Sequence, residues 1–281
     1  MESQKKYPRT FSFEFFPPKT PEGVARLRSA RKQLAQLNPR FFSVTYGAGG
    51  STRERTLETV LEIQAEGCEA APHISCVGAA KAEVAAVIEQ YRASGIRHIV
   101  ALRGDLPSGA ASAGELRHAN ELVELIRATT GDWFHVEVAC YPEFHPQART
   151  AQEDIANFKR KIEAGANSAI TQYFYNAEAY FQFVDECDAL GIDVPIVPGI
   201  MPIGNFAQLA RFSDACGAEI PRWLRHRMHG FGDDLASIRS YGLDVVTELG
   251  DRLLSQGAPG LHFYTMNQSV ATLEICDRLG L

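Results

Sequence analysis

The sequence of 281 residues has few cysteines, and their positions exclude most sites built from this residue. The six cysteines stand at positions 68, 76, 140, 187, 216 and 276, and none of them forms a CxxC or CxxxC pair. No Cys/His cluster has the spacing of a zinc site. We therefore expect buried or half-buried thiols, as in proteins of a reducing cytosol.

Long apolar runs and an excess of positive charge are also absent. No stretch reaches the ~18 uninterrupted apolar residues of a membrane span, and the polar, basic segment Met1–Thr10 is not a secretory signal. Lys and Arg number 28 against 34 Asp and Glu, which gives a formal net charge of −6. Because nucleic-acid binders are usually basic, we do not expect this protein to bind nucleic acid. Because a membrane span and a secretory signal are missing, we expect a cytoplasmic protein that does not bind membranes.

Several catalytic signatures are missing. The sequence has no GxxxxGK[ST] phosphate loop, no HExxH or paired-carboxylate metal motif and no GxSxG elbow. All lysines, at positions 5, 6, 19, 32, 81, 159 and 161, lie outside the predicted strand interiors, so a Schiff-base aldolase lacks an obvious nucleophile. These absences disfavour P-loop NTPases, metal hydrolases and serine hydrolases, and no metal site is predicted.

Short apolar runs alternate with helical patterns along the whole chain, without a linker or a change in composition that would mark a domain boundary. The cores of these runs are nearly continuously apolar, which is typical of parallel strands covered on both faces. Eight strands are predicted, at Thr10–Phe16, Phe41–Tyr46, Glu69–Cys76, His98–Leu102, His135–Tyr141, Ser168–Phe174, Val194–Pro198 and Gly260–Tyr264.

Helices are predicted between these strands, and their ends carry capping signals. The ranges are Pro21–Leu37, Arg53–Glu66, Ala80–Ser94, Gln152–Ala164, Ala177–Leu190 and Asn205–Cys216, with additional helix at about Pro221–His229 and Asp233–Gln256. The Ser51-Thr52 pair and Asn205 are candidate N-caps, and Gly95 and Gly165 suit left-handed C-caps.

The alternation favours one architecture. Eight strand–helix units in 281 residues predict an α/β protein with a (β/α)8 TIM barrel and additional helix before the eighth strand. We expect a single catalytic domain over residues 1–281. The alternative is a doubly wound open sheet, whose Gly-rich first turn is missing from the sequence.

The segment Gly47-Ala48-Gly49-Gly50-Ser51-Thr52 begins like a GxGxxG dinucleotide turn. Thr52 stands where the third glycine belongs, however, and the segment falls in the second strand–helix unit rather than the first. A βα loop at the carboxyl end of a barrel is the other interpretation, in which glycines allow a ligand to approach the backbone.

Glu14 is the most unusual polar residue in a predicted strand. A period of two places Ser12, Glu14 and Phe16 on one face of that strand. If this face lines the barrel lumen, the carboxyl group is half-buried among aromatic rings, and desolvation would raise its pKa and suit it to general acid catalysis. The alternative is a structural glutamate paired with Arg or Lys.

Further polar residues follow the predicted strands, where barrel enzymes carry their chemistry. Arg103 can meet a phosphate and Asp105 a ribityl hydroxyl, although a helix cap and a surface salt bridge would also explain them. His73 is a core histidine or a ligand contact, whereas His145, in a Pro-flanked loop, is the better candidate for ligand contact. The Lys159-Arg160-Lys161 run suits a phosphate or a solvated helix face.

Seven segments, in order along essentially the whole chain, resemble the bacterial methylenetetrahydrofolate reductase family. They are FSFEFFPPKT, FFSVTYGAGGSTRERT, LRGDLP, YPEFHP, FKRKIEAGANSAITQYFY, PIVPGIMPI and LHFYTMNQS. The resemblance implies a barrel that binds FAD tightly at the carboxyl ends of its strands. NADH or NADPH would reduce the flavin, with NADH favoured, and hydride would then pass to 5,10-methylenetetrahydrofolate by a ping-pong mechanism. The product, 5-methyltetrahydrofolate, would feed methionine synthesis.

The resemblance also implies roles for individual residues. Glu14 would be the general acid that assists opening of the folate imidazolidine ring, and Asp105 the carboxylate beside flavin and pterin. Flavin-binding positions would be Thr45, Tyr46, Ala48, His73, Arg103, Gly104, Asp105, His118, Ala119, Tyr141, His145, Ala148, Asp154, Asn157, Arg160, Lys161 and Ile170. Substrate-binding positions would be Ser12, Glu14, Asp105, Gln172, Gln208, Phe212, Tyr264 and Gln268. Of these, Phe212 has no signal of its own, and its pattern alone predicts a core residue.

Two residues depart from the family pattern. His118 stands where a tyrosine is expected at the flavin, and Gln268 where bacterial members carry an arginine able to pair with a carboxylate or phosphate. A homo-oligomer is expected, without the C-terminal regulatory domain of eukaryotic members. Other candidates are a different barrel enzyme, such as a cofactor-free lyase or a flavin-dependent amino-acid dehydrogenase, and a non-catalytic folate- or flavin-binding protein.

Overall fold

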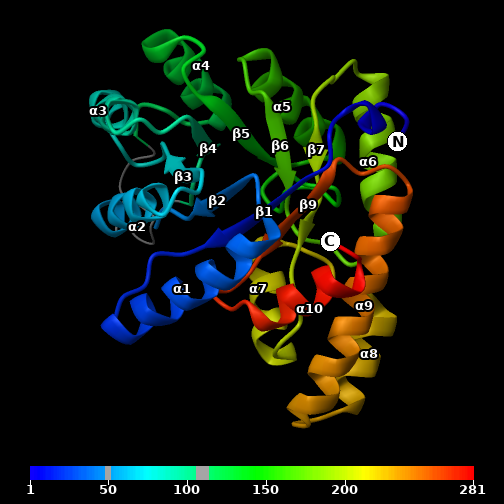
Figure 1. Cartoon of the computed structure of the whole chain (residues 1–281). Coiled ribbons are helices and arrows are strands. Elements are labelled where there is room, and N and C mark those ends of the chain that lie inside the picture. Colours follow the sequence, from blue (N-terminus) through cyan, green and yellow to red (C-terminus); the bar gives the residue numbers. More distant parts are fainter. Residues whose placement is uncertain (48–51, 106–113) are drawn as a thin grey trace.

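Parallel strands form one nearly closed ring in the computed structural model, which describes residues 1–47, 52–105 and 114–281 (Figure 1). Within these ranges the strands are β1 (Thr10–Phe15), β2 (Phe41–Val44), β3 (Ala70–Ser75), β4 (His98–Leu102), β5 (His135–Cys140), β6 (Ser168–Thr171), β7 (Ile196–Val197), β8 (Gly199–Ile200) and β9 (Gly260–Tyr264). The predicted (β/α)8 barrel is confirmed, and most strand predictions err by one to three residues at the ends.

The seventh predicted strand is split into two short strands that close the ring. The order of the sheet is β7-β6-β5-β4-β3-β2-β1-β9-β8, so β7 and β8, consecutive in the chain, occupy its two ends. Pro198 separates them, and its carbonyl accepts a hydrogen bond from the His262 N–H at 3.0 Å. The prediction that this strand ends at Pro198 is wrong, because the chain continues into β8 and pairs with β9.

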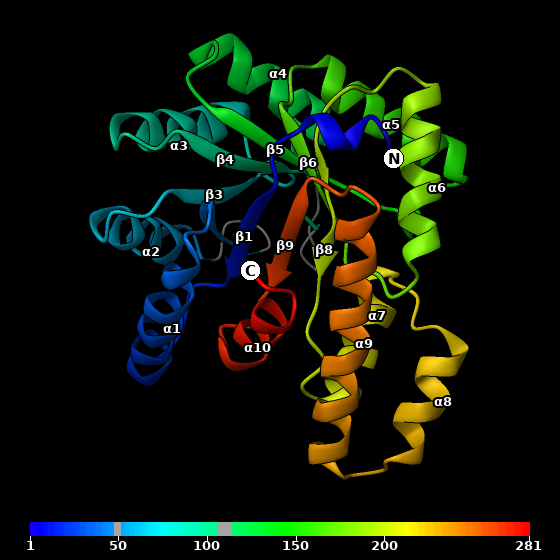
Figure 2. The same ribbon diagram turned by 45° about the vertical axis from the view of Figure 1, so that its right-hand side comes forward.

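Helices surround the barrel on the outside (Figures 1 and 2). They are α1 (Pro21–Leu34), α2 (Arg53–Ala65), α3 (Lys81–Ala93), α4 (Ala119–Thr130), α5 (Ala151–Glu163), α6 (Ala177–Ala189), α7 (Phe206–Cys216), α8 (Arg222–Gly230), α9 (Leu235–Ser255) and α10 (Val270–Arg278), with 3-10 turns η1 (Gln4–Lys6) and η2 (Ala35–Leu37). Helices α8 and α9 form the predicted additional helix and extend as a hairpin beyond the barrel (Figure 2). Among the helices of the described ranges, none combines the length and apolar character needed to cross a bilayer.

Capping follows the sequence in part. Asn205 caps α7 by accepting from the Gln208 N–H at 2.9 Å, and Gly95 and Gly165 adopt the expected positive φ. Thr52 occupies the N-cap position of α2 without making the predicted cap bond. Its hydroxyl instead accepts from the Gly47 N–H at 2.7 Å, which fixes the end of the loop after β2.

Two separate apolar regions stabilise the barrel. The larger one lies between the sheet and its helices. The smaller one consists of Phe41, Ala71, Val100 and Ile170, from four neighbouring or opposed strands, and we call it the apolar lumen layer. Alternation of side chains along each strand places polar groups in the lumen as well, among them Ser12, His73, His98, Glu137 and His262, all buried.

Gly260 sets the close pairing of β1 with β9. Its φ of +129° is unfavourable for other residues, and a Cβ placed there would lie 1.7 Å from the Thr10 carbonyl oxygen. Gly67 also has a positive φ, of +84°, but a Cβ there would meet no atom within 4 Å.

We therefore expect Gly260→Ala to lower the free energy of unfolding by at least ~3 kcal/mol, near the upper end for single substitutions, because backbone strain and a backbone clash add. Gly67→Ala is the matched control and should cost only about 1 kcal/mol, from backbone strain alone. Urea titrations followed by circular dichroism would measure both. An equal loss of unfolding free energy in the two variants would contradict this account of the pairing between β1 and β9.

Candidate active site at the carboxyl ends of the strands

A cavity of about 650 Å³ opens where the barrel strands end, which is the face that carries the active site in (β/α)8 enzymes. Strands β1 and β9 and the loops after β2, β4, β5 and β6 contribute to its wall. The predicted site residues that line it are Glu14, Thr45, Asp105, Tyr141, His145, Gln172, Gln208, Phe212 and Tyr264. Residues predicted from seven distant segments thus meet around one cavity.

Glu14 lies between two histidines, with its side chain 18 % exposed. Its Oε2 is 3.3 Å from His73 Nε2 and 3.6 Å from His262 Nε2. Burial alone raises the pKa of Glu14, but the two histidines outweigh burial and hold this pKa at about 2. The predicted rise in pKa is therefore wrong, and the partners are histidines rather than Arg or Lys.

His262 is a site residue that the sequence analysis missed. It pairs with Ser12 across β1 and β9, and the Ser12 hydroxyl lies 2.7 Å from His262 Nδ1. Ser12, predicted to bind substrate, is buried beneath the cavity and reaches Glu14 only through this histidine. The available signal was the alternation in β9, which places His262 on the same face as Tyr264.

Two tyrosines form a rigid part of the wall. The Tyr264 hydroxyl donates to the Thr171 carbonyl at 2.8 Å, and Tyr141 packs edge-on against His145 with ring centroids 4.7 Å apart. Burial raises the pKa of Tyr141 to about 12 and that of Tyr264 well above its ordinary value. Both phenols are therefore neutral near pH 7 and can act as hydrogen-bonding walls rather than as charged groups.

A second cleft, of about 220 Å³, continues from the cavity between the ends of β4 and β5 and helices α4 and α5. The cleft and the cavity share His145 and Gln147. Predicted flavin-binding residues line it: Arg103, His118, Ala119, His145, Ala148, Asp154, Asn157 and Lys161. Arg103 donates to Gln147 Oε1 at 2.6 Å, and Lys161 donates to the Ala139 carbonyl at 2.5 Å, so both cations are held beside the cleft.

A third pocket, of about 260 Å³, adjoins the cavity on the side of α7. It shares Gln208, Phe212 and Tyr264 with the cavity and adds Gln268. Phe212 is 40 % exposed, so the pattern-based interpretation of this residue as core is wrong. An exposed aromatic ring at a pocket edge can stack on a flat ligand.

The remaining predicted residues do not line these spaces. Tyr46 is half-buried, and Ile170 belongs to the apolar lumen layer. Arg160 is exposed and donates to Asn157 Oδ1, while Lys159 lies 3.8 Å from Glu163 on the surface, so only Lys161 of the basic run faces the cleft. Ala48 lies outside the described residues.

Gly104 has a packing role of its own. Its φ is +82°, and a Cβ there would lie 1.8 Å from the Ser75 hydroxyl. The same hydroxyl donates to the Arg103 carbonyl at 2.9 Å, which joins the ends of β3 and β4. Glycine at this position places the backbone of Arg103 and Asp105 against the neighbouring strand end.

The donor set fits a flavin dinucleotide. The cavity offers aromatic and amide groups suited to a flat heterocycle, and the second cleft offers cations suited to a pyrophosphate. Because the two spaces share His145 and Gln147, one extended ligand can reach both.

Comparisons with known proteins find relatives along nearly the whole chain. A family model described as methylenetetrahydrofolate reductase matches residues 1–280. The chain is 42 % identical over 271 residues to the 5,10-methylenetetrahydrofolate reductase of Escherichia coli (strain K12), covering 96 % of this chain and 90 % of that protein. It is 38 % identical over 285 residues to methylenetetrahydrofolate reductase (NADH) 1 of Arabidopsis thaliana, covering 96 % of this chain and 48 % of that protein.

A solved structure shares the fold. It is an uncharacterized protein from Clostridium thermocellum that binds two copies of 5-methyl-5,6,7,8-tetrahydrofolic acid. The TM-score is 0.68 at 16 % sequence identity, and the match covers 99 % of this chain and 97 % of that chain.

The low pKa of Glu14 predicts an acid-dependent loss of stability. Because the folded value of about 2 lies below the ordinary value of 4.5, the ionised carboxylate stabilises the fold above pH 4.5, and this contribution disappears as pH falls toward 2. We expect wild type to lose about 2 kcal/mol more than Glu14→Gln between pH 5 and pH 3. Urea midpoints at the two pH values measure this difference, and parallel curves would refute the pairing.

Proposed function

The chain belongs to the methylenetetrahydrofolate reductase family, and we propose that it reduces 5,10-methylenetetrahydrofolate to 5-methyltetrahydrofolate with NADH or NADPH as reductant. The observation that supports this best is the position of Glu14, a carboxyl group at the floor of a cavity formed by the strand ends. The product of such an enzyme is a methyl donor for methionine synthesis.

FAD is the proposed cofactor. The residues that would hold it line the cavity and the second cleft: Arg103 and Lys161 would bind its phosphates, and Tyr141 and His145 would contact its ring system. When bound, FAD would supply the hydride-transfer chemistry between the nicotinamide and the folate one-carbon unit, in a ping-pong cycle. The side chains of this protein would orient the reactants and donate the proton that the folate ring takes up.

Glu14 is the proposed proton donor. Transfer of a proton from Glu14 Oε2 to a nitrogen of the imidazolidine ring lets the C–N bond break with its electron pair on that nitrogen. The folate one-carbon unit is left as a cationic iminium, which is a better hydride acceptor than the closed ring. Asp105, exposed at the cavity mouth, contributes a negative charge that favours this cation.

The low pKa of Glu14 is compatible with this role. A ligand that covers the cavity removes water from the carboxylate, and desolvation favours its uncharged form. A proton can then move from His73 Nε2 or His262 Nε2 to Glu14 Oε2 across gaps of 3.3 and 3.6 Å. Ser12 holds His262 in place for this transfer through the contact at Nδ1.

The folate and the nicotinamide are proposed to use the same face in turn. Gln172, Gln208, Phe212 and Tyr264 line the cavity, where amides can bond a pterin or a carboxamide and Phe212 can stack on either ring. Gln268 offers a neutral hydrogen bond where an arginine would offer a charge. A substrate carboxylate or a cofactor phosphate is therefore bound less tightly at this position. NADH, which lacks the additional phosphate of NADPH, is the favoured reductant.

We also propose that residues 1–281 act as one catalytic domain, in the cytoplasm and as a homo-oligomer. The six cysteines, all unpaired, are consistent with a reducing compartment.

Purified protein with FAD should be yellow and should lose this colour anaerobically on addition of NADH, faster than with NADPH. Methylenetetrahydrofolate should then restore the colour with formation of methyltetrahydrofolate. Stopped-flow absorbance and product analysis measure both steps. A colourless preparation that takes up no FAD would refute the proposal, and restoration by an amino acid but not by the folate would point to a dehydrogenase instead.

Glu14→Gln should separate the two half-reactions. Because the amide cannot donate an acidic proton, we expect colour restoration by methylenetetrahydrofolate to slow about 10²- to 10⁴-fold, while reduction by NADH changes no more than about twofold. Glu58→Gln, the same replacement at an exposed position of α2, is the matched control and should leave both rates unchanged. Equal effects on both half-reactions would exclude Glu14 as the acid for the folate.

A further inference from the structure

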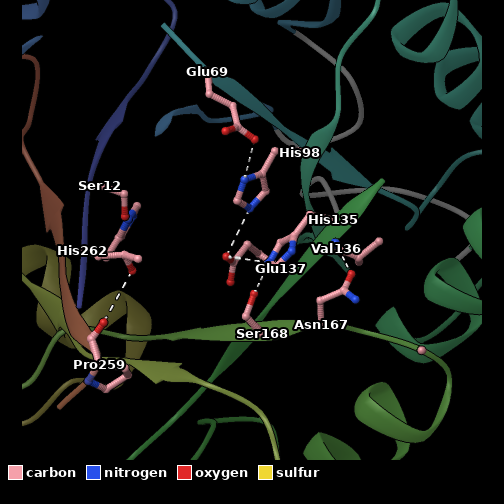
Figure 3. A network of polar contacts seen from close by, with 12 residues as sticks. Ser12, Glu69, His98, His135, Val136, Glu137, Asn167, Ser168, Pro259 and His262 are labelled. Carbon is pink, nitrogen blue, oxygen red and sulfur yellow. Dashed lines mark hydrogen bonds and ion pairs between the residues drawn. The ribbon is translucent and has the colours of Figure 1, made fainter. Parts of the chain in front are cut away.

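A second histidine–carboxylate group lies at the opposite end of the barrel, where the strands begin (Figure 3). His98 is the first residue of β4 and His135 the first residue of β5, and these two residues pair directly in the sheet. Glu137 lies two positions further along β5, on the same face as His135. About five residues, or roughly 16 Å of strand, separate His98 from the catalytic end of β4.

The three side chains converge on a common point. His98 Nε2 lies 3.1 Å from Glu137 Oε1, and His135 Nε2 lies 3.4 Å from the same oxygen. Among residues 1–47, 52–105 and 114–281 this is the one group of three histidine, cysteine or acidic side chains whose ligand atoms all lie within 4.8 Å of one another. Bond lengths of ~2.0–2.1 Å around a tetrahedral zinc ion place neighbouring ligand atoms roughly 3.3 Å apart, which matches these separations.

The group is buried and its polar atoms are not fully paired. His98 is inaccessible to solvent and Glu137 is only 4 % exposed. Glu137 Oε2 has no hydrogen-bond partner among the described residues, although a buried carboxylate oxygen without a partner is costly. A bound cation would satisfy this oxygen.

The surroundings supply the outer contacts that metal sites use. Glu69, which directly precedes β3, places its Oε1 at 3.3 Å from His98 Nδ1, on the far side of that ring from Glu137 (Figure 3). A carboxylate behind a ligating histidine fixes the ring and its tautomer, so that the other nitrogen can bind a metal. His135 is 32 % exposed, which gives an ion a way in from the rim.

We propose that His98 Nε2, His135 Nε2 and Glu137 bind a divalent transition-metal ion of the zinc type, with Glu69 orienting His98. Two imidazole nitrogens and one carboxylate favour Zn²⁺ over Mg²⁺. The Ser168 hydroxyl, 2.6 Å from His135 Nε2, gives up this contact when the metal binds and lies close enough to hold a water on the ion. The ion would tie β4 to β5 at the floor of the barrel, far from the reaction.

The experiment compares zinc binding by wild type and His135→Ala. Protein is treated with a chelator in the presence of a phosphine reductant, desalted, and titrated with Zn²⁺ by calorimetry, with retained metal measured by mass spectrometry. We expect one equivalent per wild-type chain and a loss of affinity on the order of 100-fold or more in the variant. His226→Ala, which removes an exposed histidine of α8, is the matched control and should bind like wild type.

Two further measurements keep the proposal falsifiable. Glu69→Gln alters only the contact of Glu69 with His98, so it should weaken zinc binding about 10- to 100-fold. This variant provides the test if His135→Ala does not fold. Zn²⁺, but not Mg²⁺, should raise the Tm of wild type and of His226→Ala. Equal zinc binding by wild type, His135→Ala and Glu69→Gln would overturn the proposal, as would the absence of retained zinc in wild type, and the group would then be a charge cluster of protein atoms only.

Discussion

The pairing of the first strand with the last one determines where the chemistry of this protein can occur. The register of β1 and β9 sets Ser12 beside His262 and Glu14 beside Tyr264, although about 250 residues separate the partners in the chain. Gly260 lets the two strands approach each other. The break at Pro198 divides the predicted seventh strand, so that β7 pairs with β6 and β8 pairs with β9. Without this closure Glu14 would be an edge residue in water rather than a carboxylate between two histidines.

Much of the architecture could be predicted from local pattern. Continuous apolar runs located the strands, and the period of two in β1 placed Ser12 and Glu14 on one face. The sequence analysis gives no range for α4 or α10. Helix α10 has only nine residues, and its N-cap Ser269 makes no side-chain cap bond, so its local signal is weak. Helix α4 follows His118, which is not a usual cap residue, but its buried Leu122, Val123 and Ile126 form an amphipathic pattern that could have predicted it.

The electrostatics of the site could not be predicted in the same way. The pKa of Glu14 is lowered because His73 and His262 contact it from other strands. The sequence around Glu14 indicates that the carboxyl group is buried, but it does not show which side chains of other strands lie beside it. Phe212 could not be placed from the sequence either. An apolar residue in an amphipathic helix is expected to be buried in the core, but in the fold the Phe212 side chain is exposed at the edge of a pocket. Gly104 shows that a residue near a ligand site can be required by packing alone, here by the Ser75 hydroxyl.

The apolar lumen layer lies between two groups that can exchange protons. The Phe41 ring contacts His98, with centroids 4.2 Å apart, and also faces His262, with centroids 6.1 Å apart. A hydrocarbon ring offers no site to which a proton can hop, so Phe41 provides no proton path between His98 and His262. A substitution at His98, where the strands begin, therefore meets this apolar ring before it meets the histidine beside Glu14.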